Sequence, residues 1–254
     1  MVLCVDIGNS NINICVFNPD SDAIVHSFAI TSDIYKTSDE YCVVLNALLK
    51  NEFHIAGVII GSVVPQLTPI ISNTVKSIYG IDALVVGPGV KTSLNIKTDN
   101  PAEVGADIVA NAVYAIDGDM VPAVIIDFGT ATTIVSIDES KKLTNVFILP
   151  GLYSSYKALT KEAAAIPSVP LYTPNSFLGK NTANSVNSGV VYSNAFAIDG
   201  FVDKLTENSK GCSLLATGAA APIVLPLCKN NISFNENLTC RGLYRIYLKN
   251  VHNR

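Results

Sequence analysis

The chain has 254 residues, a formal net charge of −4, and 49% hydrophobic against 15% charged residues. This length and apolar content are typical of a globular protein with one large or two smaller domains, and they exclude an intrinsically disordered chain. The negative charge, with no run of Lys or Arg, argues against nucleic-acid binding.

The start of the chain, MVLCVDIGNS, has no basic segment followed by an extended apolar one, so we expect no secretory signal. The six cysteines form no C-x-x-C pair and have no His at metal-ligand spacing, which favours reduced, buried thiols. The uncharged stretch 211–228 contains two prolines and is better explained as a buried strand, turn and helix than as a membrane span. We therefore expect a soluble, cytoplasmic protein that does not bind membranes.

Two stretches that lie half a chain apart share one pattern. They are VLCVDIGNSNINICVFN at 2–18 and VPAVIIDFGTATTIVSID at 121–138. In each, an apolar run of strand length ends in an Asp-x-Gly tripeptide, and a second β-branched strand follows at once. The pattern predicts two β-hairpins, each with a carboxylate and exposed backbone N–H groups at its turn.

The turn residues suit the binding of a polyphosphate. Gly8 and Gly129 have no Cβ, so an oxygen-rich ligand can approach the backbone closely. Asp6 and Asp127 can hold a cation directly or through water, and short donors surround them at Asn9, Ser10, Asn11, Thr130, Thr132 and Thr133. One such hairpin alone is explained equally well as an ordinary turn. Two copies favour a metal-nucleotide site built from two facing hairpins.

Strands and helices alternate in the rest of the chain. We expect strands over 23–30, 57–64, 83–86 and 213–217, and helices over 37–51, 65–78, 152–165 and 178–199, the last with small residues suited to close helix packing. The repeated plan predicts an α/β fold of two related halves, 1–117 and 118–254. Each half is expected to be a mixed sheet covered by helices, with a nucleotide cleft between the halves.

The stretch 100–117, NPAEVGADIVANAVYAID, has helical spacing of its apolar residues, with Pro101 where the helix would begin. Asp107 falls near the N-terminus of this helix, where the helix dipole stabilises an anion. Spacing alone leaves two interpretations open: Asp107 only complements the dipole, or it is a general base beside the nucleotide.

Over nearly its full length the chain resembles the type III pantothenate kinases, a family of the actin/hexokinase/Hsp70-like ATPase superfamily. The motifs that carry the resemblance are VDIGNSN at 5–11, GSVVP at 61–65, NPAEVGAD at 100–107, IDFGTATT at 126–133, PGL at 150–152, LGKNTANSVNSG at 178–189, ATG at 216–218 and NLTCRGL at 237–243. The order of EVGAD and IDFGTATT is the specific signal. The resemblance implies two ribonuclease H-like, actin-like ATPase halves.

The resemblance also implies an activity: ATP-dependent phosphorylation of pantothenate to 4′-phosphopantothenate, the first step of coenzyme A biosynthesis. Asp107 would be the general base, Asp127 would hold K⁺ or NH₄⁺, and Asp6 would act with Mg²⁺. ATP would be bound by Asp6, Ile7, Gly8, Asn9, Ser10, Asn11, Ile12, Asn13, Gly129, Thr130 and Thr132. Pantothenate would be bound by Thr98, Gly105, Ala106, Asp107, Ile108 and Thr182, the last from the neighbouring subunit of a homodimer.

The chain departs from the family pattern at several positions. Ile108 stands where the family has Arg, Thr98 where it usually has Tyr, Asn145 and Val146 where it has Gly-Gly, and Ala219 where it has the second Gly of T-G-G. Loss of the Arg removes a charged donor worth about 1.5–3 kcal/mol, or roughly ten- to a hundred-fold in affinity.

Two alternatives to a working pantothenate kinase follow from these departures. One is a divergent paralogue of the same fold whose kinase activity is weak, lost or redirected, with a regulatory or interaction role. The other is a sugar kinase or ATPase module of the superfamily, which the length and EVGAD fit poorly.

Overall fold

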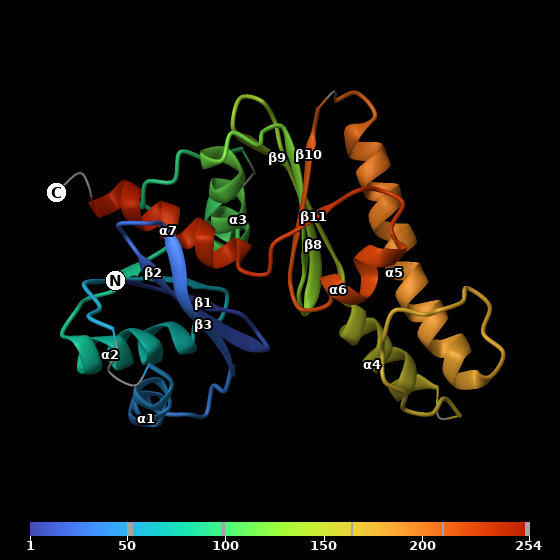
Figure 1. The fold of residues 1–254 in the computed structure, drawn as a ribbon, viewed down its shortest axis with the longest axis horizontal. Helices are drawn as coiled ribbons and strands as arrows, with labels where there is room; N and C mark the ends of the chain where they lie inside the picture. Colours follow the sequence, from blue (N-terminus) through green and yellow to red (C-terminus); the bar gives the residue numbers. More distant parts are fainter. Residues whose placement is uncertain (50–52, 98–99, 164, 210, 252–254) are drawn as a thin grey trace. The chain divides into compact units, whose positions relative to one another are not determined.

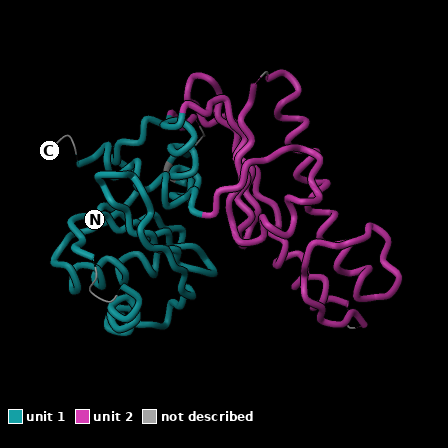
Figure 2. Tube along the Cα trace, viewed as in Figure 1, with its two compact units in different colours: residues 1–94, 98–118, 237–254 teal, residues 95–97, 119–236 magenta. Residues whose placement is uncertain are grey.

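The computed structural model describes residues 1–49, 53–97, 100–163, 165–209 and 211–251 (Figure 1). The chain forms two compact units (Figure 2). Unit 1 comprises Met1–Leu94, Thr98–Gly118 and Asn237–Arg254, and unit 2 comprises Asn95–Lys97 and Asp119–Glu236. The predicted division at 117 and 118 differs from these units chiefly at the C-terminus, where the chain returns to unit 1.

Unit 1 contains a five-stranded sheet in which strands from distant parts of the chain are neighbours. Its order is β3 (Ala23–Thr31), β2 (Asn11–Asn18), β1 (Val2–Ile7), β4 (Gly57–Ser62) and β5 (Leu84–Val85). β2 is antiparallel to both β1 and β3, whereas β1, β4 and β5 are parallel to one another. The sheet is therefore mixed, as predicted.

The sheet of unit 2 repeats this plan. Its order is β11 (Ser233–Phe234), β10 (Ser213–Thr217), β7 (Ala123–Phe128), β8 (Ala131–Ile137), β9 (Lys142–Pro150) and β6 (Asn95–Ile96). β8 is antiparallel to β7 and β9, and β7, β10 and β11 are parallel. Strands β7 to β11 thus correspond to β1 to β5, and β6 is an addition at the edge. The same sheet occurs twice, which confirms the predicted pair of related α/β folds.

Helices cover both faces of the sheet in unit 1. Alternate residues of β1, Leu3, Val5 and Ile7, join one apolar cluster with residues of α1 (Ser38–Leu49) and α2 (Leu67–Tyr79). α3 (Ala106–Asp117) and α7 (Leu238–Val251) pack against each other and against β4. The backbone carbonyl of Ala110 in α3 lies so close to Gly242 of α7 that a Cβ there would overlap it. Glycine at 242 therefore allows the two helices to touch.

In unit 2, the alternate residues Val124, Ile126 and Phe128 of β7 face a second apolar cluster. Its helical members come from α4 (Leu152–Glu162), α5 (Thr182–Thr206) and α6 (Ala221–Val224), which a short 3₁₀ turn, η2 (Leu225–Leu227), follows. The other residues of β7, including Asp127, project from the opposite face of the sheet. The carboxylate of Asp127 is therefore kept out of the apolar cluster of unit 2.

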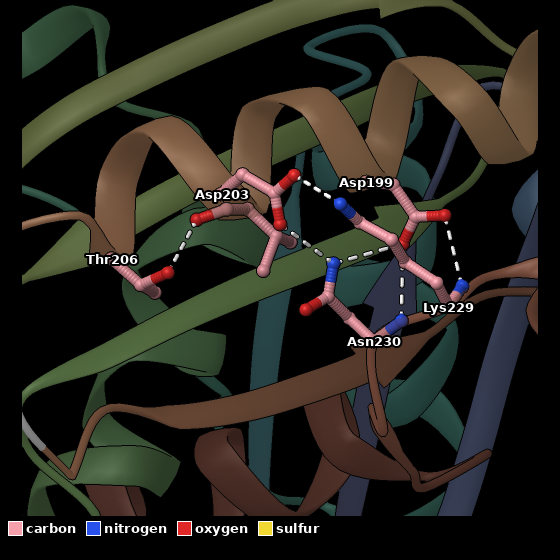
Figure 3. A network of polar contacts seen from close by, with 6 residues as sticks. Asp199, Asp203, Thr206, Lys229 and Asn230 are labelled. Atoms are coloured by element: carbon pink, nitrogen blue, oxygen red, sulfur yellow. Dashed lines mark hydrogen bonds and ion pairs between the residues drawn. The ribbon is translucent and has the colours of Figure 1, made fainter.

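A polar network ties the segment after η2 to α5 (Figure 3). The buried carboxylate of Asp199 accepts the backbone N–H groups of Lys229 and Asn230 at 2.9 and 3.2 Å. Asp203, one turn later on α5, forms an ion pair with the Lys229 side chain and accepts a hydrogen bond from Asn230. These bonds satisfy the backbone of a connecting segment, so we assign the network a structural role.

Several element boundaries differ from the expectations. Pro101 begins a 3₁₀ turn, η1 (Pro101–Glu103), and α3 begins only at Ala106, so the predicted helix start at Pro101 is wrong. α5 covers 182–206 rather than 178–199, because the Asn181 side chain caps it by accepting the Asn184 N–H at 2.9 Å. The end of the helix expected over 37–51 lies outside the described residues.

All six cysteines are free, and Cys4, Cys15 and Cys240 are buried, as predicted for several of them. Cys4 and Cys15 are direct cross-strand partners in the β1–β2 ladder. Within the described parts of the chain, no helix combines the length and apolar character needed to cross a membrane.

Candidate active site

The β1–β2 turn brings the predicted residues from Asp6 to Asn13 into one hairpin. Gly8 donates its N–H to the carbonyl of Asn11 at 3.0 Å, and a Cβ on Gly8 would lie 3.1 Å from that oxygen. The turn is therefore tight, and glycine fits it best. Asn9, Ser10 and Asn11 are exposed around it, so their polar groups are available to a ligand.

Asp6 is the charged residue of this hairpin, one position before the end of β1. Asn13, directly opposite it on β2, donates a hydrogen bond to Oδ2 at 3.0 Å. Burial raises the pKa of Asp6 to about 6, with the Asn13 bond opposing this and the charge of Asp107 adding to it. Asp6 and Asp107 are thus close enough to interact electrostatically, although they are about a hundred positions apart in the sequence.

Asp107 is the second residue of α3. Its Oδ1 accepts the N–H of Ile108 at 2.8 Å, and a Cβ on Gly105 would collide with the same oxygen. Burial raises the pKa of Asp107, while the N–H groups of Ile108 and of Asp107 itself lower it. The geometry matches the dipole-complementing interpretation, and the raised pKa also makes the carboxylate a better proton acceptor.

The predicted pantothenate-binding residues lie in different surroundings. Ala106 and Ile108 are buried, so the Ile108 side chain packs within the protein. Thr182 is exposed in the first turn of α5, where it is accessible to a ligand or another chain. Thr98 lies outside the described residues.

The β7–β8 turn is enclosed by two glycines that follow other strands. Gly218, after β10, has φ +94°, and a Cβ there would lie 2.6 Å from the backbone of Phe128 and 2.7 Å from Oδ1 of Asp127. Gly151, after β9, lies so close to the carbonyl oxygens of Gly129 and Thr130 that a Cβ would overlap both. Only glycine fits at either position without a backbone shift, which explains the ATG and PGL motifs.

Thr132 follows this turn on β8 and is 2% exposed. Among the described residues, its hydroxyl is a buried side-chain atom with no hydrogen-bond partner. Thr132 lies opposite Phe128 in the ladder, and opposite residues project from the same face of a sheet. Its side chain therefore lies on the helix-covered face, and its predicted contact with ATP stays a prediction.

Three departures from the family pattern lie in unit 2: Asn145, Val146 and Ala219. Asn145 is exposed on β9 and donates hydrogen bonds to the hydroxyls of Ser136 and Thr144 at 2.9 and 3.3 Å. This group lines an open cavity of about 590 Å³ at the end of the β7–β8 hairpin that lies away from the turn. Ala219 is exposed, so its methyl group displaces nothing from the core of unit 2.

No group of three or more His, Cys, Asp or Glu side chains in the described chain is placed to hold a metal ion. A cation at Asp6 or Asp127 would need oxygen ligands from nucleotide or water. Mg²⁺ is usually held in this way, by one or two carboxylates together with substrate phosphates. The donor set therefore fits a nucleotide-bound Mg²⁺ and does not resemble a closed structural metal site.

Comparison with known proteins agrees with this geometry. A Sinorhizobium meliloti structure assigned as a 2-dehydro-3-deoxygalactonokinase shares the fold with a TM-score of 0.61 at 10% identity, covering 98% of this chain and 97% of that one. A Campylobacter jejuni structure assigned to the Baf family of transcriptional activators has the same score at 20% identity, covering 98% and 99%. The duplicated sheet and these neighbours show an actin/hexokinase-like α/β fold.

The sequence comparisons identify the family. The profile of the type III pantothenate kinases matches residues 2–204. The type III pantothenate kinase of Dictyoglomus turgidum is 38% identical over 99% of this chain and 100% of its own length. That of an Exiguobacterium species is 36% identical over 98% and 99%. The chain therefore belongs to the type III pantothenate kinase family, and the predicted kinase class is confirmed.

Proposed function

We propose that this protein transfers the γ-phosphoryl group of ATP to pantothenate, giving 4′-phosphopantothenate at the first step of coenzyme A biosynthesis. The observation that supports this best is the electrostatic interaction of Asp107, at the start of α3, with Asp6, which lies next to the tight Gly8 turn. Phosphoryl transfer depends mainly on positioning and charge neutralisation, and it needs one group that orients the attacking hydroxyl. This part of unit 1 offers both kinds of group.

In the proposed reaction, Asp107 accepts the proton of the pantothenate hydroxyl as that oxygen attacks the γ-phosphorus, and ADP leaves. The raised pKa of Asp107 favours proton acceptance. The turn residues of both hairpins hold the phosphates, and Asp127 holds K⁺ or NH₄⁺. When bound with ATP beside Asp6, Mg²⁺ neutralises charge on the transferred phosphoryl group. Pantothenate is held by Thr98, Gly105, Ala106, Ile108 and Thr182.

We further propose a homodimer in the cytoplasm, formed through an aromatic surface on α5 that consists of Tyr192 and Phe196 of this helix and of Phe177, which precedes it. Phe177 and Phe196 are 60% and 55% exposed, and Tyr192 packs between them with ring-centre distances of 5.0 and 5.6 Å. They line a groove of about 340 Å³ whose other residues are small: Gly179, Ser185, Ser188, Gly189 and Ser193. Exposed aromatic residues beside small ones suit a second chain, and the exposed Thr182 lies on the same helix.

The first test is coupled ADP release by purified protein with ATP, Mg²⁺ and K⁺, with and without pantothenate. Pantothenate-dependent release is expected, and omission of K⁺ should reduce it. ATP binding without turnover would contradict the proposal and favour the divergent paralogue, to which the buried Ile108 in place of Arg points. Turnover with hexoses but without pantothenate would favour a sugar kinase.

A further inference from the structure

Ser32, which lies outside the first hairpin, forms hydrogen bonds to two backbone carbonyl groups of that hairpin's turn. Ser32 follows β3 directly, and its backbone N–H donates to the carbonyl of Ser10 at 3.0 Å. The Ser32 hydroxyl donates to the carbonyl of Gly8 at 2.5 Å. One half-buried residue thus fixes two peptide groups of the turn, and nothing in the local sequence distinguishes this serine from others.

The second hairpin has a related arrangement in unit 2. Gly151, the residue after β9, donates its N–H to the carbonyl of Thr130 at 3.2 Å, as Ser32 does to Ser10 in unit 1. In unit 2 the hydroxyl group is supplied by a different residue, Ser154 in the first turn of α4. It donates a hydrogen bond to the same Thr130 oxygen at 2.6 Å. Each turn therefore has one carbonyl that accepts a hydrogen bond from a serine hydroxyl beyond its third strand, although the carbonyls occupy different positions.

Fixing a carbonyl also fixes the N–H group of the next residue. In a planar trans peptide the C=O and N–H bonds point in opposite directions. The bond from Ser32 to Gly8 therefore directs the N–H of Asn9 away from Ser32. In the same way, the bond from Ser154 to Thr130 directs the N–H of Ala131 away from Ser154. Backbone N–H groups held in fixed directions at a turn are the donors that phosphate oxygens use.

We infer that Ser32 and Ser154 are positioning residues that set the direction of the Asn9 and Ala131 N–H groups for the phosphates of ATP. This inference rests on the proposed function, because it assumes that the two turns bind the nucleotide. Each hydroxyl is hydrogen-bonded to a backbone carbonyl, so it acts through the turn. Their loss should weaken ATP binding without changing the affinity for pantothenate.

The test compares Ser32→Ala and Ser154→Ala with matched serine variants. Ser27→Ala removes an exposed hydroxyl from β3, and Ser155→Ala removes the neighbouring hydroxyl of α4, which reaches Pro150 only at 3.5 Å. Steady-state kinetics give KM for ATP and for pantothenate, and titration calorimetry gives the Kd of ADP with Mg²⁺. We expect KM for ATP and Kd for ADP to rise about three- to ten-fold in the two test variants, as expected for one lost hydrogen bond. KM for pantothenate should stay within about two-fold, and Ser32→Thr should restore ATP binding because it keeps the hydroxyl.

A second measurement does not depend on activity. Amide hydrogen exchange in the ligand-free protein reports on the hydrogen-bonded N–H groups of the two turns: it should be faster at Gly8, which donates to Asn11, in Ser32→Ala and at Gly151, which donates to Thr130, in Ser154→Ala than in wild type. Unchanged ATP parameters in both test variants, or equal losses in Ser27→Ala and Ser155→Ala, would overturn the inference. If wild-type protein neither binds ADP nor releases it from ATP, the proposed function itself fails at the first measurement. A wild-type protein that works beside unaffected variants refutes only the positioning role.

Discussion

Asn13 lies directly opposite Asp6 in the β1–β2 ladder and donates a 3.0 Å hydrogen bond to its carboxylate. Strand pairing, which local patterns predict well, thus places a neutral donor beside the charged group of the turn. The bond favours the ionised form of Asp6, whereas burial and the charge of Asp107 oppose it.

The raised pKa of Asp6 predicts a pH-dependent stability of the metal-free protein. Folding holds the Asp6 proton up to a pH of about 6, whereas the unfolded chain releases it near 3.8, so the native state binds more protons between these values. Its contribution to stability is present below pH 3.8 and is lost as pH rises through 6. Asp6→Asn should therefore be more stable than wild type at pH 7 by about 1–3 kcal/mol, with the difference vanishing near pH 4.

Denaturant unfolding in buffer with a chelator, at pH 4 and pH 7, measures this difference. Asn13→Ala is the control with the opposite sign, because loss of the hydrogen bond should raise the pKa of Asp6 further and lower stability at pH 7. A pH-independent difference between Asp6→Asn and wild type would show that the carboxylate is not destabilised by folding.

Asp107→Asn should abolish pantothenate-dependent turnover and leave the fold intact. The Asn oxygen can still accept the Ile108 N–H at the start of α3, but it cannot accept the substrate proton. A loss of at least about 100-fold in kcat is expected, with the melting temperature within a few degrees of wild type. Asp117→Asn is the matched control: it breaks an ion pair with Lys249 at the other end of α3 and should keep turnover. Retained turnover in Asp107→Asn would show that another group accepts the proton.

Gly242→Ala should destabilise the protein, because the new methyl group would overlap the carbonyl of Ala110 and force α7 away from α3. A cost of about 1–3 kcal/mol is typical of such overpacking. Gly200→Ala in α5 is the control, since a Cβ at Gly200 meets no atom within 4 Å and Ala is the better helix former. Thermal unfolding of both variants tests this prediction, and the melting temperature of Gly242→Ala should be the lower of the two. Equal melting temperatures would contradict the close contact of α3 and α7.

The sequence predicted the parts of this fold whose determinants are local. Apolar runs that end in Asp-x-Gly mark β1 and β7, and the strands that follow them could be located by their β-branched residues. β9 was not predicted, because Leu149, Pro150 and Gly151 indicate a turn, although the run VFIL at 146–149 is apolar and of strand character. α7 was not assigned as a helix either, and its return to unit 1 depends on the contact of Gly242 with Ala110, which no local pattern contains.

The site residues also differ in whether the sequence alone could predict them. Gly8 and Asp6 could be found from the sequence because a tight acidic turn needs those residue types. The nearness of Asp107 to Asp6 depends on the packing of α3, and only the family resemblance indicated a joint role. Ser32 and Ser154 gave no signal at all, since their importance rests on which carbonyl each hydroxyl reaches.

The aromatic surface on α5 predicts a homodimer that a single polar substitution should weaken. Phe196→Ser removes an exposed ring that packs beside Phe177 and Tyr192, and burial of such a ring at an interface commonly contributes about 2 kcal/mol or more. Size exclusion with light scattering should show a dimer for wild type and a shift toward monomer at low micromolar concentration for the variant. Phe234→Ser, at a 43% exposed aromatic residue on β11, is the control and should stay dimeric. If Thr182 acts across the interface, Phe196→Ser should also lose turnover on dilution, whereas a monomeric wild type would contradict both the dimer and the role of Thr182 in the neighbouring subunit.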